Sequence, residues 1–599
     1  MDAKHVVSKP VGGGFLLYES LPDQIVTPED FTEEQRMFAD TTQAFLEGDV
    51  LPNDEQLEKL DYELTVKLMR KAGELGLLAA DVPEAYGGLG LDKVSSTIIN
   101  ETLAQSSSFA LSIGAHVGIG TLPIVFFGSE AQKQKYLPEL ASGAKIAAYC
   151  LTEPASGSDA LGARTTAKLS EDGKHYVLNG SKIYITNAGF ADLFIVYAKV
   201  DGTKFTAFIV ERSLPGFTVG PEEKKMGIKG SSTCPLYFDN MPVPVENVLG
   251  EIGKGHLIAF NILNIGRFKL GAGCLGAAKE AIRLASSYAN VRTQFGKPIS
   301  HFTLIRQKLA DMNAITYVLE SMVYRTSGYI DGMLSDMDHQ SAEAGKASAK
   351  AIAEYALECS INKIFASEAL QFVADEAVQI HGGYGYTQEY KVERIYRDAR
   401  INRIFEGTNE INRLLIPGTL LKKAMKGELP LIERLESLQQ ELLAPLPSAS
   451  PIHDSLSEQS ELLSRLKTIF LFVGGSAVQK FGQGIDEEQE VLAHLSDMII
   501  SIYAAESALL RAEKLAERYG QEKSALAAAM TLIYLRDSIA ATDISAKELL
   551  AYISTGDTLK TQLSILKKLV RTQSSSLTPL KRTIASQVVA QEGYVTVAT

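Results

Sequence analysis

Tryptophan is absent from this chain of 599 residues, and only four residues are cysteine. Cys150, Cys234, Cys274 and Cys359 lie far apart, so they fit neither a zinc knuckle nor a redox pair and are expected to be core thiols. No two histidines have the His-x-x-x-His spacing of a helical metal site, and no glycine-rich loop ends in Lys-Ser or Lys-Thr. Gly382, Gly383 and Gly385 resemble a dinucleotide fingerprint only loosely, because no βαβ pattern surrounds them. The sequence therefore predicts no metal site and no P-loop.

Long apolar runs and an excess of basic charge are also missing. We expect no membrane-spanning helix, because no stretch approaches ~20 uncharged apolar residues. No apolar segment of ~7–15 residues follows Lys4 and Lys9, so no secretory signal is expected. The 72 acidic and 59 basic residues give a net charge of −13 and a pI near 5.4, which disfavours a nucleic-acid partner. These features favour a cytoplasmic protein.

The hydrophobic pattern changes its character twice along the chain. Helical spacing from about residue 31 gives way near residue 145 to short β-rich segments, and it returns after residue 255. Asp172-Gly173, Asn179-Gly180 and Asp201-Gly202 suit tight hairpin turns, which indicates a small antiparallel domain. A Pro- and Ser-containing linker at residues 445–451 precedes two further helical stretches, about 455–520 and 522–570.

The predicted fold class is α+β. It comprises an N-terminal helical domain, a middle antiparallel β-barrel-like domain, a C-terminal four-helix bundle and an additional C-terminal helical domain. Their expected bounds are residues 31–145, 146–252, 253–426 and 427–599.

Residues 149–159 include a Gly-Ser-Asp turn, which taken alone is an ordinary Asx or Ser turn. Together with the segments described below, which follow in order, they resemble the acyl-CoA dehydrogenase family of flavoproteins, over residues 31–424. The resemblance implies that this loop contacts FAD, and that Ser158 also contacts the substrate. Backbone and hydroxyl donors suit the carbonyl groups and N1 of a flavin ring. The implied cofactor residues of the loop are Tyr149, Leu151, Thr152, Gly157 and Ser158.

The next segment, Tyr184-Ile185-Thr186, departs from the family pattern, which usually has tryptophan first. By resemblance, Tyr184 forms the aromatic wall beside the flavin and Thr186 donates a hydrogen bond to it. The same three residues also suit an ordinary strand. The substitution leaves the expected reaction type unchanged. Because tyrosine stacks on the flavin with less area than tryptophan, it is expected to affect the redox potential of the flavin.

Residues 292–297 and 379–385 resemble the segments that hold the adenosine-diphosphate half of an FAD bound mainly by the neighbouring subunit. An arginine fork suits the pyrophosphate, and glycines let peptide N–H groups approach it. Taken alone, the two segments are equally well interpreted as a solvated arginine and a helix-capping glycine pair. The resemblance implies a homo-oligomer. Its cofactor residues here are Arg292, Gln294, Phe295, Gln379, Gly382 and Gly383.

Residues 400–411 resemble the family's catalytic loop, with Glu406 at the position of the general base. The resemblance implies that Glu406 removes the α-proton of an acyl thioester while hydride leaves the β-carbon for the flavin. Its backbone N–H and a ribityl hydroxyl of FAD would stabilise the enolate oxygen. An apolar pocket would raise the pKa of this carboxyl group towards neutrality, whereas Glu406 taken alone would be a surface residue near a helix start.

Further roles are implied beside the base. Thr408 and Glu410 are expected to contact FAD, and Asn264, Arg267 and Gly407 to contact the substrate. Arg267 taken alone would be an exposed helix arginine.

Gly114 and Gly118 fall on one face of an expected helix that, by resemblance, lines the closed end of the acyl pocket with Leu111 and Ala115. An interior glycine costs about 1 kcal/mol relative to alanine, so the pair indicates either room for a long acyl tail or close helix packing. The region after residue 426 resembles the longer branch of the family, which includes very-long-chain acyl-CoA dehydrogenases and forms homodimers. There, residues 563–571 suit membrane-surface contact less well than an amphipathic core helix.

The sequence therefore predicts FAD-dependent α,β-dehydrogenation of long-chain fatty acyl-CoA to trans-2-enoyl-CoA in fatty-acid β-oxidation. A separate electron-transfer flavoprotein is the expected electron acceptor. Two alternatives stay open: an acyl-CoA oxidase, which reduces oxygen directly, and a non-catalytic flavin-binding relative with an assembly or protective role. The presence of Glu406 and the acidic pI count against the second alternative.

Overall fold

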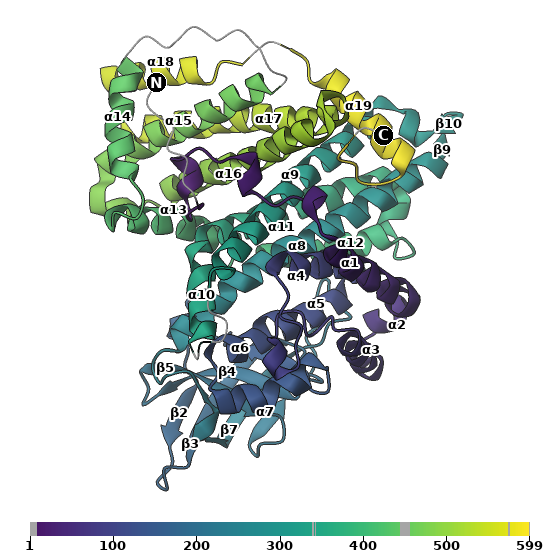
Figure 1. The fold of residues 1–599 in the computed structure, drawn as a ribbon, viewed down its shortest axis with the longest axis vertical. Coiled ribbons are helices and arrows are strands. Elements are labelled where there is room, and N and C mark those ends of the chain that lie inside the picture. The colour runs from purple at the N-terminus through teal and green to yellow at the C-terminus, as the bar shows by residue number, and fades with distance from the viewer. Residues whose placement is uncertain (1–8, 338–340, 342, 444–455, 573–574, 598–599) are drawn as a thin grey trace.

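The computed structural model describes residues 9–337, 341, 343–443, 456–572 and 575–597. The described chain is elongated, with the larger β-sheet at the lower end of Figure 1, long helices at the centre, and the helices that follow residue 425 at the upper end. The predicted linker at residues 445–451 lies outside the described residues, as does Lys4.

Helices form the N-terminal region, and short polar residues mark several of their starts. The side chains of Thr32, Asp61, Asp92 and Ser129 each accept a hydrogen bond from a backbone N–H group of the first turn that follows. The helices are α1 (Glu33–Phe45), α2 (Asp54–Glu58), α3 (Tyr62–Glu74), α4 (Lys93–Leu103), α5 (Ser108–Gly114), α6 (Leu122–Phe127) and α7 (Glu130–Ala141). Between α5 and α6 the chain forms the π-helical segment η8 (Ala115–Thr121), a rare geometry that is frequent at functional sites.

An eight-stranded sheet follows, in the order β6-β7-β3-β2-β4-β5-β8, with β1 also paired to β4. The strands are β1 (Ala147–Cys150), β2 (Thr166–Leu169), β3 (His175–Thr186), β4 (Leu193–Val200), β5 (Lys204–Glu211), β6 (Phe217–Val219), β7 (Thr233–Pro244) and β8 (Val248–Leu249). The pairings β2–β3, β3–β7, β4–β5, β5–β8 and β6–β7 are antiparallel, as predicted. The sheet is nevertheless mixed, because β4 runs parallel to both β1 and β2.

Two of the three predicted hairpin turns are confirmed. Gly173 and Gly202 have φ of 68° and 76° and lie in the turns β2–β3 and β4–β5. The prediction of a turn at Asn179-Gly180 is wrong, because both residues lie inside β3, at an irregularity in its pairing with β7. Glycine is needed there for another reason: an added Cβ would lie 2.6 Å from Oγ1 of Thr165.

Long helices form the centre of the molecule. They are α8 (Gly255–Val291), α9 (Thr303–Leu334), α10 (Ala344–Glu354), α11 (Ala356–His381), α12 (Lys391–Ala399) and α13 (Asn409–Met425), with the short hairpin β9 (Thr293–Gln294) and β10 (Lys297–Pro298) after α8. Helix α8 packs against α9 and α11, and α11 packs against α13. Small buried residues such as Ala278, Ala281 and Ala285 let these helices approach closely.

The predicted additional helices are present and cover α9 and α13. They are α14 (Leu431–Leu443), α15 (Ser457–Phe481), α16 (Gln489–Tyr519), α17 (Gln521–Ile553), α18 (Gly556–Leu569) and α19 (Thr578–Gln591), the last of which the sequence pattern did not reveal. Leu566 and Leu569 of α18 are buried, so this part of the chain packs as an amphipathic core helix.

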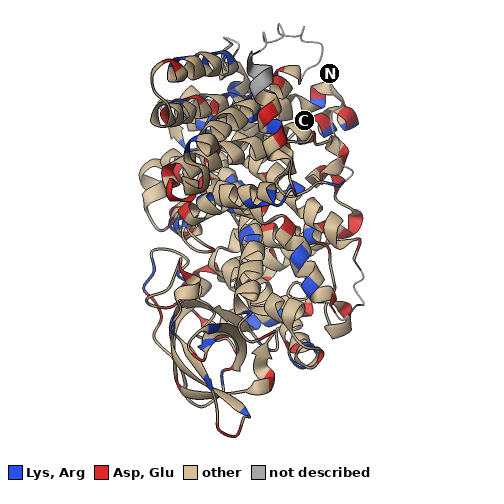
Figure 2. Ribbon diagram, turned by 90° about the vertical axis from the view of Figure 1, so that its left-hand side faces the viewer, with Lys and Arg blue, Asp and Glu red and all other residues tan. Residues whose placement is uncertain are grey.

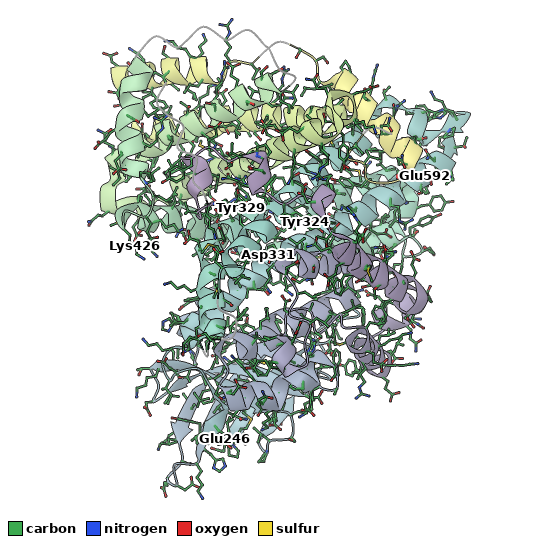
Figure 3. All side chains as sticks on the ribbon, in the orientation of Figure 1. Glu246, Tyr324, Tyr329, Asp331, Lys426 and Glu592 are labelled. Atoms are coloured by element: carbon green, nitrogen blue, oxygen red, sulfur yellow. The ribbon has the colours of Figure 1, made fainter. Side chains whose placement is uncertain are left out.

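Buried ion pairs join α16 to the centre of the molecule and to the segment before α1. Arg511 of α16 is 1% exposed and pairs with Glu29 and with Glu320 of α9, each at 2.6 Å. Further along α9, the hydroxyl group of Tyr324 donates to Glu101 of α4 (Figure 3). Acidic and basic residues are interspersed along the helices in Figure 2.

Two helical segments are long and apolar enough to cross a membrane by length and composition, namely Ser108–Phe127 and Gln521–Ile553. The expectation that no stretch approaches this length was therefore wrong: 20 consecutive residues from Ser108 to Phe127 carry no Asp, Glu, Lys or Arg. Buried residues make up 78% and 61% of the apolar windows of the two segments. A buried core helix passes the same test, so these segments are weak evidence for membrane insertion.

Candidate active site

Glu406 lies in a short loop between the 3-10 turn η13 (Arg400–Arg403) and α13. Its φ is 57°, and Gly407 follows with φ of 80°. A non-glycine residue in this region is strained by about 1–3 kcal/mol, and such strain is often found at active sites. Thr408 then caps α13, its hydroxyl group accepting the N–H of Ile411 at 3.2 Å. The loop therefore has one defined shape, with Glu406 at its bend.

Three side chains from α8, α11 and α13 hold the carbonyl groups of this loop. Arg267 donates from Nε to the carbonyl of Glu406 at 3.1 Å. Lys363 donates from Nζ to the carbonyl of Gly407 at 2.7 Å, and Asn412 donates to the same carbonyl at 2.8 Å. The N–H of Glu406 donates to no residue in the described part of the chain, so it is available to a ligand oxygen.

The carboxyl group of Glu406 lies against the backbone of α8. A Cβ atom added at Gly266 would lie 2.4 Å from Oε2 of Glu406, so a larger residue at that position would displace the carboxyl group. Oε2 is buried and has no hydrogen-bond partner among the described residues. Burial raises the pKa of Glu406 to about 7, although the positive charges of Arg267 and Lys363 act in the opposite direction. Such a group can act as a general base near neutral pH.

Glu406 lines a cavity of about 190 Å³ between α8 and the α5–η8 segment. The lining stripe on α8 runs from Gly266 to Ala277, which is about 16 Å at ~1.5 Å per residue. The facing wall contains Leu111, Gly114, Ala115, Gly118 and Ile119. Thr186, at the end of β3, also lines the cavity. A long, mostly apolar channel with few polar groups suits an extended apolar ligand.

The two glycines singled out in the sequence have different surroundings. A Cβ atom added at Gly114 would meet no heavy atom within 4 Å, so this residue borders free space. At Gly118 the added atom would lie 3.4 Å from Cδ of Lys269, whose ammonium group pairs with Asp81 at 2.5 Å. Asp81 also pairs with Lys93. Gly114 therefore borders free space, whereas a Cβ atom at Gly118 would be in ordinary van der Waals contact with the stem of Lys269.

The predicted flavin loop follows β1, and residues of β3 bind its backbone and side chains. Lys182 of β3 donates to the carbonyl of Leu151 at 3.1 Å and pairs with Glu153 at 2.7 Å. The carbonyl of Thr152 accepts the N–H of Ile183 at 3.0 Å. These contacts fix the backbone of the loop and leave the side chain of Thr152 half-buried.

The other predicted flavin residues around this loop differ in exposure. Gly157 and Ser158 are exposed, and an added Cβ at Gly157 would meet nothing within 4 Å. Tyr149 is buried in β1, and its hydroxyl group has no partner among the described residues. Tyr184 has φ of 59° and is 62% exposed, whereas Thr186 lines the cavity with Glu406.

The remaining predicted cofactor residues form a second set. The guanidinium carbon of Arg292 lies 5.3 Å from the ring centre of Tyr384, in the turn that contains Gly382 and Gly383. Gln294, Phe295, Gln379, Gly382, Gly383 and Glu410 are exposed, and Phe295 is 93% exposed. In Figure 1, β9 and β10 lie at the upper right, whereas β2, β3 and β7 lie at the bottom. One chain therefore does not bring the hairpin together with the β domain.

The predicted substrate residues Asn264 and Arg267 lie together on α8. Both are buried, and Nη1 of Arg267 donates to Oδ1 of Asn264 at 3.1 Å. The interpretation of Arg267 as an exposed helix residue is therefore wrong. With its Nε group on the carbonyl of Glu406, Arg267 supports the loop, and the structure brings Asn264, Arg267, Glu406 and Gly407 into one cluster.

Several residues of this site were not found from the sequence. Lys363, Asn412 and Gly266 support Glu406, and no motif in the sequence singled them out. Ile228 and Asp398 also line the cavity. Asp398 accepts the N–H of Ile228, its Oδ2 atom has no partner among the described residues, and burial raises its pKa to about 6.

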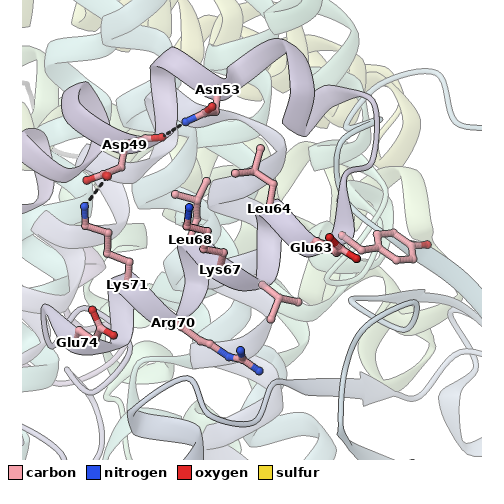
Figure 4. A pocket seen from close by; sticks show the side chains of 11 residues that line it. Asp49, Asn53, Glu63, Leu64, Lys67, Leu68, Arg70, Lys71 and Glu74 are labelled. Carbon is pink, nitrogen blue, oxygen red and sulfur yellow. Dashed lines mark hydrogen bonds and ion pairs between the residues drawn. The ribbon is translucent and has the colours of Figure 1, made fainter.

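A larger hollow of about 760 Å³ lies along α3, away from Glu406 (Figure 4). Its lining alternates acidic and basic side chains, and Lys71 pairs with Asp49 at 2.5 Å. Asn53 donates to the carbonyl of Asp49 at 2.7 Å. None of the described residues that line this hollow has a buried, unpaired polar atom, in contrast to the surroundings of Glu406.

Four family models match the chain, and together they cover most of it. The N-terminal, middle and C-terminal domains of acyl-CoA dehydrogenase match residues 32–144, 148–241 and 253–421, and a second acyl-CoA dehydrogenase C-terminal domain matches residues 465–568. The predicted order of helical, sheet, helical and additional helical regions is therefore confirmed.

Similar proteins include a probable acyl-CoA dehydrogenase of Bacillus subtilis, 55% identical over 99% of this chain and 100% of that protein. The very long-chain specific acyl-CoA dehydrogenase of Bos taurus mitochondria is 40% identical over 85% of this chain and 79% of its own length. A crystal structure of an acyl-CoA dehydrogenase complexed with FAD from Bacillus anthracis is 53% identical, with a TM-score of 0.96 over 98% of this chain and 100% of that one. This chain belongs to the acyl-CoA dehydrogenase family of oxidoreductases.

Proposed function

We propose that this enzyme oxidises long-chain fatty acyl-CoA to trans-2-enoyl-CoA, as a step of fatty-acid β-oxidation, with Glu406 as the general base. The observation that carries the proposal is the carboxyl group of Glu406, which has a buried, unpartnered oxygen atom and lines an apolar channel. An unpaired carboxylate in an apolar cavity is costly unless it acts on a ligand.

The residues around the loop after β1 fit FAD. Gly157 and Ser158 are exposed and offer backbone and hydroxyl groups to a ligand, and the exposed ring of Tyr184 offers an aromatic face. Leu151, Thr152 and Thr186 would hold the flavin end, and Arg292, Gln294, Phe295, Gln379, Gly382, Gly383, Thr408 and Glu410 would hold the remainder. FAD, when bound, supplies the acceptor for the two electrons of the oxidation. The crystal structure of the relative from Bacillus anthracis, titled as an FAD complex, supports this assignment.

The chain itself performs the proton chemistry. Oε2 of Glu406 takes the proton from the α-carbon of the thioester, and the free N–H of Glu406 donates to the thioester oxygen as negative charge develops there. The pKa near 7 keeps much of the base ionised at neutral pH while leaving it basic enough to react. Arg267 and Asn264 keep the loop in place, and Ser158 would contact the thioester end of the substrate.

The preference for a long acyl chain rests on the channel beside α8. Its stripe of about 16 Å from Gly266 to Ala277 provides length, and Gly114 leaves free space on the opposite wall. The likeness to a very long-chain specific relative supports the same substrate class.

We infer that two copies of the chain complete the cofactor site. The hairpin β9–β10, with Phe295 93% exposed, is separated from the β domain in Figure 1. The set around Arg292 in one copy would therefore reach the FAD held by the β domain of the other copy. The additional helices cover α9 and α13, so these two helices are not available for contacts with further copies of the chain. We therefore propose a homodimer rather than a larger assembly.

The first test is the visible spectrum of the purified protein under anaerobic conditions, before and after adding acyl-CoA of increasing chain length. We expect a flavin spectrum that palmitoyl-CoA bleaches more effectively than butyryl-CoA. A flavin that no acyl-CoA reduces would contradict the proposal. Mixing the reduced enzyme with an electron-transfer flavoprotein or with oxygen then separates a dehydrogenase, which we propose, from an oxidase.

A further inference from the structure

Lys363, in the middle of α11, is a fully buried cation without a carboxylate partner. Its ammonium group contacts two neutral acceptors among the described residues, the carbonyl of Gly407 and Oδ1 of Asn409, both at 2.7 Å. The buried lysines 182 and 269 differ, because they pair with Glu153 and Asp81. Burying an ammonium group without a counter-charge is unfavourable for folding, so stability does not explain a lysine here.

The charged and titratable groups near Lys363 come from four elements. Burial lowers the pKa of Lys363 to about 8, so most of the group remains protonated at pH 7. Glu406, in the loop before α13, and Glu410 of α13 favour its charged form, as does Cys274 of α8, whereas Arg267 of α8 disfavours it. Glu406 in turn is acted on by Arg267, Lys363 and Tyr149 of β1.

We propose that Lys363 is a positioning residue for the base: its ammonium group holds the carbonyl of Gly407, the residue that follows Glu406. The proposal rests on the role of Glu406 given above. Arg267 and Lys363 hold two successive carbonyl groups, at residues 406 and 407, so both peptide planes that follow the base are fixed. Fixing them stabilises the left-handed backbone that leaves the N–H of Glu406 free.

The test compares FAD-loaded wild-type enzyme with Lys363→Met, Lys363→Arg and a matched control. Lys308→Met is the control, because Lys308 joins α9 to Glu376 of α11 outside the site. Infrared difference spectra, recorded without substrate, follow the ionisation of the Glu406 carboxyl group, whose band is assigned by its loss in Glu406→Gln. We expect Lys363→Met to raise the midpoint by about one pH unit, Lys363→Arg to restore it and Lys308→Met to leave it unchanged.

Flavin reduction by palmitoyl-CoA gives the second readout. At pH 7, Lys363→Met is expected to slow flavin reduction about fivefold with little change in the half-saturating substrate concentration, and higher pH is expected to recover much of the rate. A midpoint in Lys363→Met equal to that of wild type would overturn the proposal. If Lys363→Met does not fold, Lys363→Gln provides the same comparison with an uncharged amide. A shifted midpoint in an enzyme that no acyl-CoA reduces would support the role of Lys363 and refute the proposed substrate.

Discussion

The free space beside Gly114 leads to a prediction about chain length. Gly114→Leu would place four carbon atoms in the channel, and the absence of any heavy atom within 4 Å of the added Cβ means that the fold should accept them. If the new side chain displaces about three methylene groups of a bound tail, the loss is about 2.4 kcal/mol at ~0.8 kcal/mol each. That corresponds to a decrease of about 50-fold in kcat/KM for palmitoyl-CoA.

The assay is steady-state turnover with palmitoyl-CoA and butyryl-CoA, each compared with wild type. Butyryl-CoA should be affected little, because its short tail does not extend along the whole stripe from Gly266 to Ala277. Gly114→Ala is the matched control: it adds one carbon, and removing a helical glycine should increase the free energy of unfolding by up to about 1 kcal/mol. If Gly114→Leu keeps the wild-type ratio of the two kcat/KM values, Gly114 does not border the acyl tail and the reasoning fails.

Four other changes test the base and its surroundings. Glu406→Gln should retain bound flavin and lose flavin reduction by substrate, and reduction at the wild-type rate would exclude Glu406 as the base. Because only the ionised carboxyl group accepts a proton, the reduction rate of wild type should reach a plateau above pH ~7 and fall about tenfold per unit well below it; a flat stopped-flow profile from pH 5 to 9 would contradict this. Gly266→Ala should displace the carboxyl group of Glu406 and slow reduction about 100-fold at unchanged flavin content, and a rate near that of wild type would disprove the close packing. Asp81→Asn leaves two buried lysines with one neutral partner and should lower the free energy of unfolding by about 3–5 kcal/mol in urea, whereas a loss below about 1 kcal/mol would show that the site adapts.

The order of helical and β regions could be predicted because each region repeats its pattern many times. Helices of more than 25 residues, such as α8 and α9, show the helical period over many turns. A single dipeptide carries much less information. Asn179-Gly180 has the composition of a hairpin turn, but both residues lie inside β3. Glycine is needed at position 180 because Thr165, from outside this strand, packs closely against it. Local composition therefore indicated where glycine is needed, but not whether the cause was a turn or a packing contact.

Gly118 illustrates the same limit in the channel. The sequence placed it with Gly114 on one helix face, and both line the cavity. Only the structure distinguishes them, because Gly118 meets the stem of Lys269, a residue about 150 positions away in sequence, whereas Gly114 meets free space. The surroundings of each glycine are formed by residues that are distant in sequence, so the spacing of the two glycines on one helix does not predict them.

The residues that support Glu406 were harder to find from the sequence than Glu406 itself, and the reason is chemical. Glu406 lies in a segment with a distinctive sequence motif. Lys363 and Asn412, by contrast, donate hydrogen bonds to a backbone carbonyl group, which every residue has. Any donor of suitable length at the right place could do the same, so their function imposes no motif. Burial provides the missing signal: a lysine that is fully buried and bound only to neutral acceptors needs a reason beyond stability. In this fold the nearby carboxyl group of Glu406 supplies that reason, because its ionised form is the one that the buried charge stabilises.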